Sequence, residues 1–384
     1  MSNQLNNGGV TLPTAYERKQ IFYWLKQISS YTAWNRILVF YRTWADTTEN
    51  CARLASEAST AESNGGPAND YNAILKGLAH CEEASVRLKK GDKRIFKYDA
   101  NGELAMANRP RSHWMQRLFR IEDREEPELN EDNTPGWTPF RQALENLSHA
   151  WGECSPDILE SQYLDTASHT FCNNYLRETL NRITPPNPLP EVPTPKEVTL
   201  VQSGKRVPCS GIWEPVDAPK RNVFSLFRNN EPPAESFPIA GTMSYLHVGS
   251  NAPNMAAYGE ELGLPTTWHL LWRDTRYEDG TIPEEERDYI FLKPDSTREE
   301  TRPVTSSAHE PFIWVESGHP APQTGRWLAE HDLQTSVTLQ VGEVLPLNRG
   351  RPTRWMLAQA QMRTASCVRG WSTPLPTVGS TSTT

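Results

Sequence analysis

The sequence predicts an α+β protein, with an N-terminal all-α helical domain followed by an all-β C-terminal domain that contains two related small β units. Three observations predict this class. Apolar residues recur at helical spacing up to about residue 183, and a proline-rich segment then follows. After that segment the apolar residues alternate with a period of two, and one motif occurs twice.

The first domain, expected over residues 1–183, is mainly helical. Residues Thr14 to Glu17 have the sequence of a capping box, which predicts the start of the first helix. Apolar spacing predicts the second and third helices, and the turn-forming residues 99–102 predict a hairpin. The further elements expected are a helix from Trp34 past Leu54, a helix at 67–90, a hairpin at 94–106, a helix capped at Thr138, and a last helix at about 157–183.

A linker is expected at residues 184–197. Six prolines fall among residues 184–195, and such a segment favours a stiff, polyproline-like conformation. We therefore place the domain boundary there, with the β-rich domain over 198–371. The Ser-, Thr- and Pro-rich tail at 372–384 is expected to be disordered.

The β-rich domain contains an internal repeat. The pattern V-x-S-G-x-x-x-P-x-[ST]-G-x-W begins at Val201 and again at Val315, 114 positions later, so we expect related units at 198–292 and 312–360. The motif predicts a strand, a loop and a second strand, with glycines at turns or bulges and the tryptophan in a small core. Tryptophans exposed for stacking on a sugar or peptide are the alternative. The motif residues are Gly204, Pro208, Gly211 and Trp213 in the first copy, and Gly318, Pro322, Gly325 and Trp327 in the second.

Composition restricts the class of function and the compartment. The formal net charge is −8 and no basic stripe occurs, which argues against a nucleic-acid partner. The first residues lack the features of a signal peptide, and the longest apolar run, Ile37–Tyr41, is too short to span a membrane. The six cysteines show no C-x-x-C spacing, which is typical of free thiols in a reducing compartment. We expect a cytoplasmic protein.

Catalytic patterns are missing from the sequence. There is no G-x-S-x-G, H-E-x-x-H, Walker lysine loop or G-x-G-x-x-G after a strand. Cys209 lies inside the first copy of the motif, but the second copy has Gln323 there, which favours a structural role over a nucleophile. His319 and His331 fit no metal-ligand spacing. We therefore expect no enzyme activity, no cofactor and no metal, although paired carboxylates for hydrolysis stay open.

Several segments resemble a known group of proteins. They are residues 203–215 around the first motif, the stretch Gly241–Leu246, the pair Ala252-Pro253 and the stretch Trp268–Trp272. In this order they resemble immunity proteins 71 and 72 of bacterial polymorphic toxin systems, most clearly from 198 to 292. The resemblance implies a cytoplasmic antidote, encoded beside a type VI secretion effector of the Rhs class, that binds and neutralises one cognate toxin domain. A cell-wall or glycan-related binding module or hydrolase remains the alternative.

Two acidic segments are candidate contacts for such a toxin. Exposed acids would steer a toxin with a basic cleft toward its inhibitor. Trp137 and Tyr277 would supply the desolvated anchors of the interface. Ordinary solvated loops are the alternative for both segments. The acidic candidates are Glu122, Asp123, Glu125, Glu126 and Glu128 in the helical domain, and Glu284, Glu285 and Glu286 in the β-rich domain.

Overall fold

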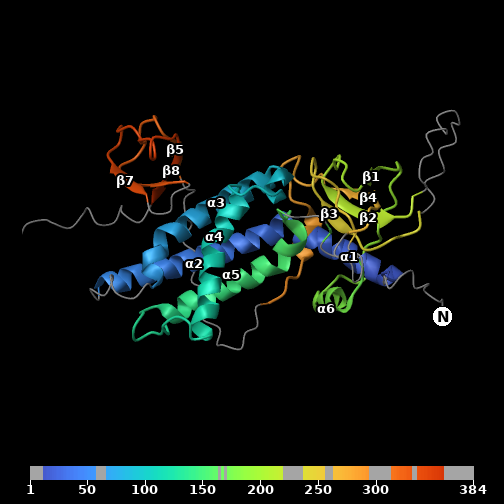
Figure 1. Ribbon diagram of the computed structural model, residues 1–384, viewed down its shortest axis with the longest axis horizontal. Coiled ribbons are helices and arrows are strands. Elements are labelled where there is room, and N and C mark those ends of the chain that lie inside the picture. Colours follow the sequence, from blue (N-terminus) through green and yellow to red (C-terminus); the bar gives the residue numbers. More distant parts are fainter. Residues whose placement is uncertain are drawn as a thin grey trace, which may run out of the picture. The chain divides into compact units, whose positions relative to one another are not determined.

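The computed structural model describes residues 12–57, 66–162, 166–167, 171–218, 237–255, 263–293, 313–330 and 335–358. The chain divides into two compact units, Met1–Pro311 and Phe312–Thr384 (Figure 1). Unit 1 contains the described helices and a four-stranded sheet, and unit 2 contains a second four-stranded sheet. The predicted fold class, helices followed by two β units, is confirmed. The expected tail at 372–384 lies outside the described residues.

In unit 1 the structure describes six α-helices, all of which precede the first sheet. The capping box at the start of the first helix is present, since the Glu17 amide donates to Thr14 Oγ1 at 3.2 Å and the Thr14 amide donates to Glu17 Oε2 at 2.7 Å. Short 3-10 turns, η1 (Pro67–Asp70) and η2 (Lys93–Phe96), precede α3 and α4. The helices are α1 (Ala15–Ile28), α2 (Tyr31–Glu57), α3 (Tyr71–Lys89), α4 (Glu103–Glu122), α5 (Trp137–Ile158) and α6 (Asn174–Arg182).

Two of the elements expected from the sequence are wrong. Residues 94–106 form no hairpin, because the turn at 99–102 leads into α4, where Gly102 is the N-cap. The expected helix at 157–183 is interrupted, since α5 ends at Ile158 and α6 begins only after Asn173. The Asn173 side chain caps α6 by accepting from the Leu176 amide at 2.8 Å.

Aromatic side chains fill the core between the helices. Trp114 of α4 packs against Phe140 of α5 with ring centroids 4.8 Å apart, and Trp34 of α2 packs between Phe96 and Trp151. All five are buried. The high tryptophan content of the chain therefore serves packing within unit 1.

The two sheets share one topology. The first has the strand order β1-β4-β2-β3, and the second has the order β5-β8-β6-β7, with every neighbouring pair antiparallel. The strands correspond one to one in chain order. They are β1 (Leu200–Gln202), β2 (Gly211–Val216), β3 (Ser244–Leu246) and β4 (Thr267–Arg273), then β5 (Trp314–Glu316), β6 (Gly325–Ala329), β7 (Ser336–Leu339) and β8 (Arg354–Ala358).

Side-chain hydrogen bonds repeat along with the strands. The indole of Trp268 in β4 donates to the Pro253 carbonyl at 2.8 Å, and the indole of Trp355 in β8 donates to the Pro346 carbonyl at 2.9 Å. Trp213 and Trp327 are fully buried at matching positions of β2 and β6. Turn and packing chemistry therefore defines the repeat, as the motif predicts.

The first sheet is joined to the helices by buried contacts. Arg18 of α1 donates two hydrogen bonds of 2.8 Å to the Glu214 carboxylate of β2, and Phe22 of α1 meets Trp272 of β4 edge to face. Ala167, which lies between α5 and α6, belongs to the core of the first sheet. Because of these contacts the expected domain boundary at 184–197 lies inside unit 1, and the compact units separate after Pro311.

Candidate partner-binding site

The first acidic segment connects α4 to α5. Glu122 forms an ion pair with Arg141 at 2.6 Å, and Glu126 pairs with Arg117 at 2.9 Å and Arg120 at 2.6 Å. Hydrogen bonds from Arg120 and Arg117 lower the pKa of the partly exposed Glu126 carboxyl. Two of the five candidate acids are thus engaged within the protein.

The other three acids of this segment are available to a partner. Asp123, Glu125 and Glu128 are exposed, and their carboxylates form no ion pair with any residue that the structure describes. The proposed anchor Trp137 is buried and stacks on Phe140 at 5.7 Å, which removes it from the surface. Phe119, in the last turn of α4, is 57% exposed and is the aromatic beside this loop.

The second acidic segment follows β4 and contains a 3-10 turn, η4 (Glu284–Asp288). Glu284 and Glu285 lie at the surface. Glu284 pairs with the exposed Arg287 of the same turn at 3.0 Å, and Glu285 pairs with Lys26 of α1 at 2.7 Å. Glu286 is buried, and its carboxylate accepts from the Thr32 amide at 3.1 Å and the Thr32 hydroxyl at 2.8 Å. The acid run therefore has one member pointing inward that anchors η4 to the start of α2.

Tyr277 is also buried, and it cannot serve as the exposed anchor expected from the sequence. Its hydroxyl donates to Glu286 and accepts from the Tyr31 amide at 2.6 Å. Its backbone has φ +71, a left-handed conformation that is uncommon outside glycine. Tyr277 thus holds the turn after β4 against the junction between α1 and α2.

Four buried charges lie beneath η4. The Arg276 guanidinium lies 2.7 Å from the Asp274 carboxylate and 3.8 Å from Glu286, and the Lys93 ammonium lies 3.7 Å from Asp274. Burial lowers the pKa of Lys93 to about 8. Burial alone would raise the pKa of Asp274, but Arg276, Lys93 and the hydrogen bond from the Tyr245 hydroxyl together hold that pKa below its ordinary value. Two cations and two anions balance, and we refer to these four residues as the buried ionic cluster.

Arg276 extends the cluster to the helices. It donates to the Lys26 carbonyl at 2.8 Å and to the Ser29 hydroxyl at 2.7 Å, both at the end of α1. The segment after β4 is therefore bonded to α1, to η2 through Lys93 and to α2 through Glu286. These bonds to α1, η2 and α2 hold the exposed side of η4 in one conformation.

The exposed side of η4 combines acidic and apolar residues. Ile282 is 41% exposed and Ile290 is 56% exposed, and the acids around them are at the surface. Beside them is an open cleft of about 530 Å³ lined in part by Arg36, Tyr289 and Phe291. We call this surface the η4 face and define it by Glu278, Asp279, Ile282, Glu284, Asp288 and Ile290.

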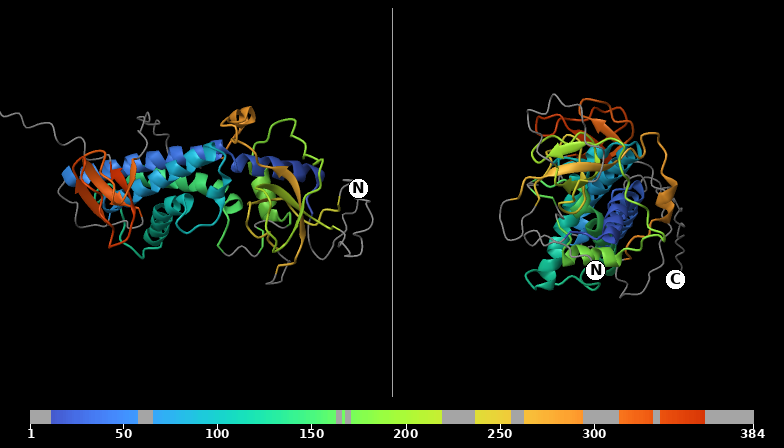
Figure 2. Two further views of the ribbon diagram at one scale, coloured as in Figure 1. Left: turned by 90° about the horizontal axis from the view of Figure 1, so that it is seen from above. Right: turned by 90° about the vertical axis from the view of Figure 1, so that its right-hand side faces the viewer.

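The two acidic segments are not brought together. The η4 segment contacts α2 at Thr32, whereas the end of the α4–α5 loop contacts α2 at Cys51, whose thiol lies 3.3 Å from the Gly136 carbonyl. At 1.5 Å per residue, these contact points are about 28 Å apart along α2. Figures 1 and 2 show the two segments on separate parts of unit 1. They are two surfaces, and each needs its own test.

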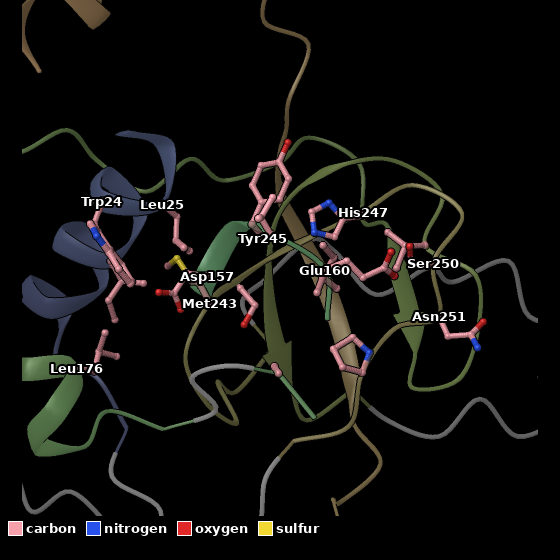
Figure 3. Close-up of a pocket in the computed structure, with 17 residues that line it drawn as sticks. Trp24, Leu25, Asp157, Glu160, Leu176, Met243, Tyr245, His247, Ser250 and Asn251 are labelled. Atoms are coloured by element: carbon pink, nitrogen blue, oxygen red, sulfur yellow. The ribbon is translucent and has the colours of Figure 1, made fainter. Parts of the chain in front are cut away.

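A small, partly open cavity lies between α1, the end of α5 and the first sheet (Figure 3). Its volume is about 40 Å³, which is room for about one water molecule. His247 and Ser250 line it, and among the described residues neither His247 Nδ1 nor Ser250 Oγ has a hydrogen-bond partner. Burial lowers the pKa of His247 to about 4, so the imidazole is neutral. The cavity is too small for a substrate.

The described thiols have the environment of structural cysteines. Burial raises the pKa of Cys51 and Cys81 to about 12 and that of Cys172 to about 11, and it also raises the pKa of Cys209.

No group of three or more His, Cys, Asp or Glu side chains in the described ranges is placed to hold a metal ion. None of the described helices is long and apolar enough to cross a membrane.

Comparison with known families gives two matches. The model of Immunity protein 71 matches residues 12–169, and the model of Immunity protein 72 matches residues 192–290. The resemblance stated from the sequence is thereby confirmed. No curated protein and no solved structure matches this chain. The first match covers the helices up to the end of α5, the second covers the first sheet and η4, and unit 2 lies outside both.

Proposed function

We propose that this chain, matched by the models of two immunity-protein families, is an immunity protein that neutralises one cognate antibacterial toxin. It acts in the cytoplasm by direct protein–protein contact and without catalysis. The toxin is the C-terminal domain of a type VI secretion effector, of the Rhs class. The observation that carries the proposal is the pair of immunity matches, which together extend from residue 12 to residue 290.

The η4 face is our first candidate for the toxin contact. Its carboxylates favour a basic partner by electrostatic steering, and its two exposed isoleucines offer apolar area. The adjoining cleft of about 530 Å³ can receive side chains of the partner. The buried ionic cluster fixes this surface before binding, so little entropy is lost when the complex forms.

The α4–α5 loop is the second candidate. It offers Asp123, Glu125 and Glu128 beside Phe119, an arrangement of the same kind. The apolar area of this loop is smaller than that of the η4 face, because the loop has one exposed aromatic and the η4 face has two isoleucines and a cleft. Reversing Glu122 or Glu126 in this loop would break ion pairs with arginines of α4 and α5, so these two residues are left unchanged in the test. The ion pair of Glu284 is exposed and joins it to Arg287 of its own turn, so its reversal leaves the packing of η4 intact.

The structure does not support a glycan-binding role. That hypothesis requires the tryptophans of the repeated motif to lie at the surface, where a sugar ring could stack on them. Trp213 and Trp327 are both fully buried. We therefore propose no second function.

The test compares two triple charge reversals in the full-length chain. One carries Glu278→Lys, Glu284→Lys and Asp288→Lys on the η4 face, and the other carries Asp123→Lys, Glu125→Lys and Glu128→Lys on the α4–α5 loop. The partner is the toxin domain encoded by the gene next to that of this chain. Surface plasmon resonance at several salt concentrations gives the association rates. We expect the η4 variant to associate on the order of tenfold more slowly, with a weaker salt dependence, and to protect cells less.

The two triples change the net charge equally, so each is the control for the other. An equal effect of both would indicate general charge rather than a contact surface. If the unmodified chain does not bind this toxin and does not protect cells from it, the proposed function is wrong. If it binds and neither triple changes the association rate, only the assignment of the surface is wrong.

A further inference from the structure

The two β units can be compared along one edge, the loop before the last strand. In unit 1 this edge is 249–254, and in unit 2 it is 342–347. The backbone bonds that hold it are the same, since the Gly249 amide donates to the Val207 carbonyl and the Gly342 amide donates to the Ala321 carbonyl, both at 2.8 Å. The two edges are therefore equivalent position by position.

In unit 1 another segment of the chain covers this edge. Thr166 pairs with Asn254 in a parallel bridge, and the Ala167 amide donates to the Asn254 carbonyl at 3.0 Å. Ala167 is buried and belongs to the core of the first sheet. Pro253 is buried as well. A short extended segment thus completes the core from outside the sheet.

In unit 2 no described segment covers the same edge, and the edge is more apolar. Val344 is 59% exposed and Leu347 is 54% exposed, where unit 1 has Asn251 and Asn254. Pro346, the counterpart of the buried Pro253, is exposed. We call Val341, Val344, Pro346 and Leu347 the open edge; Val341 is 64% exposed.

The core of unit 2 lacks a described counterpart of the residue that covers the edge in unit 1. Among the described residues its cluster has a counterpart for each member of the first core except Ala167. Val315 and Leu339 are only partly buried, whereas their counterparts in unit 1 are buried. Single exposed aliphatics are ordinary on a surface, but four apolar residues within seven positions, at an edge that is covered in the sister unit, form a patch that calls for a partner.

We propose that the open edge binds an extended, apolar segment of the cognate toxin, in the way that residues 166–167 cover the edge of unit 1. The toxin segment pairs with the backbone at Leu347 and places a small apolar side chain where Ala167 lies in unit 1. A second copy of this chain cannot supply its own residues 166–167, because they already cover its own first sheet. This inference rests on the proposed function and gives unit 2 a role in it.

The test replaces two residues of the open edge by the residues that unit 1 has at the same positions. In the full-length chain, Val344→Asn with Leu347→Asn introduces the side chains found at Asn251 and Asn254, so the β unit is expected to fold. The matched control is Val39→Asn with Val86→Asn, two exposed valines on α2 and α3. Binding is measured by titration calorimetry with the toxin domain encoded by the adjacent gene. We expect the Kd of the edge variant to rise at least tenfold and that of the control to change less than twofold.

Hydrogen exchange on the unmodified chain gives a second readout that needs no variant. With the toxin bound, the amides of Val344, Leu347 and Asn348 should exchange more slowly than in the free chain. An unchanged Kd for the edge variant, or unchanged exchange at these amides in a complex that forms, overturns this inference and leaves the proposed function standing. Self-association of the chain that the edge variant abolishes, seen by sedimentation, would assign the edge to a second copy and also overturn it. Absence of binding by the unmodified chain would instead refute the proposed function.

Discussion

At the scale of single residues, the same motif glycine has different surroundings in the two units. A Cβ added at Gly211 would lie 2.1 Å from the Trp272 carbonyl oxygen, which is backbone of the neighbouring strand. A Cβ added at Gly325 would lie 2.5 Å from Leu357 Cδ1, the end of a flexible side chain. A clash with a carbonyl inside a sheet can be relieved only by moving the strand, whereas a leucine can change its rotamer.

We therefore expect Gly211→Ala to destabilise its unit by more than about 3 kcal/mol and Gly325→Ala by about 1 kcal/mol. Urea unfolding followed by tryptophan fluorescence measures both. Gly204→Ala is the control, because its Cβ would meet nothing within 4 Å and only its positive φ opposes the change. Equal losses at Gly211 and Gly325 would contradict the explanation from local packing.

Residue types alone did not reveal which acids and aromatics are exposed. Trp137 and Tyr277 stand beside acids in the sequence, as surface anchors do, but tertiary contacts bury both. Glu286 is one of three consecutive glutamates, and only the fold turns it toward Thr32. Phe119 was missed because its neighbours in α4 gave no sign of which helix face is exposed.

At the scale of elements, local signals predicted some helix ends well and others badly. The capping box of α1 was readable because both of its bonds join residues three apart. The turn residues at 99–102 predict the tip of a hairpin, although a turn residue before Glu103 also suits a helix start at Gly102. Packing of Leu104 and Ala107 in the helical core decides between the two, and no local pattern contains that information.

The buried ionic cluster yields a prediction at this scale. Asp274→Asn removes the anion between two buried cations, so the segment after β4 should lose its attachment to α1 and η2. We expect unit 1 to lose about 3–5 kcal/mol of its free energy of unfolding. Asp288→Asn is the matched control, since this aspartate is exposed and the same change there should cost less than about 0.5 kcal/mol. A similar small loss for both variants would show that the cluster contributes little.

At the scale of the whole molecule, sequence families and compact packing divide the chain differently. The family matches change between residues 169 and 192, close to the proline-rich segment, whereas unit 1 continues to Pro311. The proline pattern was visible in the sequence, but the contacts across it were not, because Arg18 and Glu214 are 196 positions apart. The internal repeat, in contrast, was readable, since it depends on spacing within each copy.

Truncation distinguishes these two divisions. A chain ending at Pro311 should keep the circular dichroism and the cooperative thermal unfolding of unit 1, because its core and ionic cluster are complete. A chain ending at Ile183 should lose cooperative unfolding, since α1 then lacks Glu214 and Trp272, and Thr32 lacks Glu286. A helical fragment that unfolds cooperatively on its own would show that the first sheet is dispensable.

The shared topology of the two sheets also creates a hazard of strand exchange within one chain. Their cores counter it by dividing volume differently: the first core contains Val207 and Ala252, where the second contains Ala321 and Leu345 at the equivalent positions. Exchange of one element would put Val207 with Leu345, which overfills a core, and leave Ala321 with Ala252, which leaves a cavity. The larger side chain occupies one position in the first core and the other position in the second. This difference in packing favours each repeat pairing with its own strands.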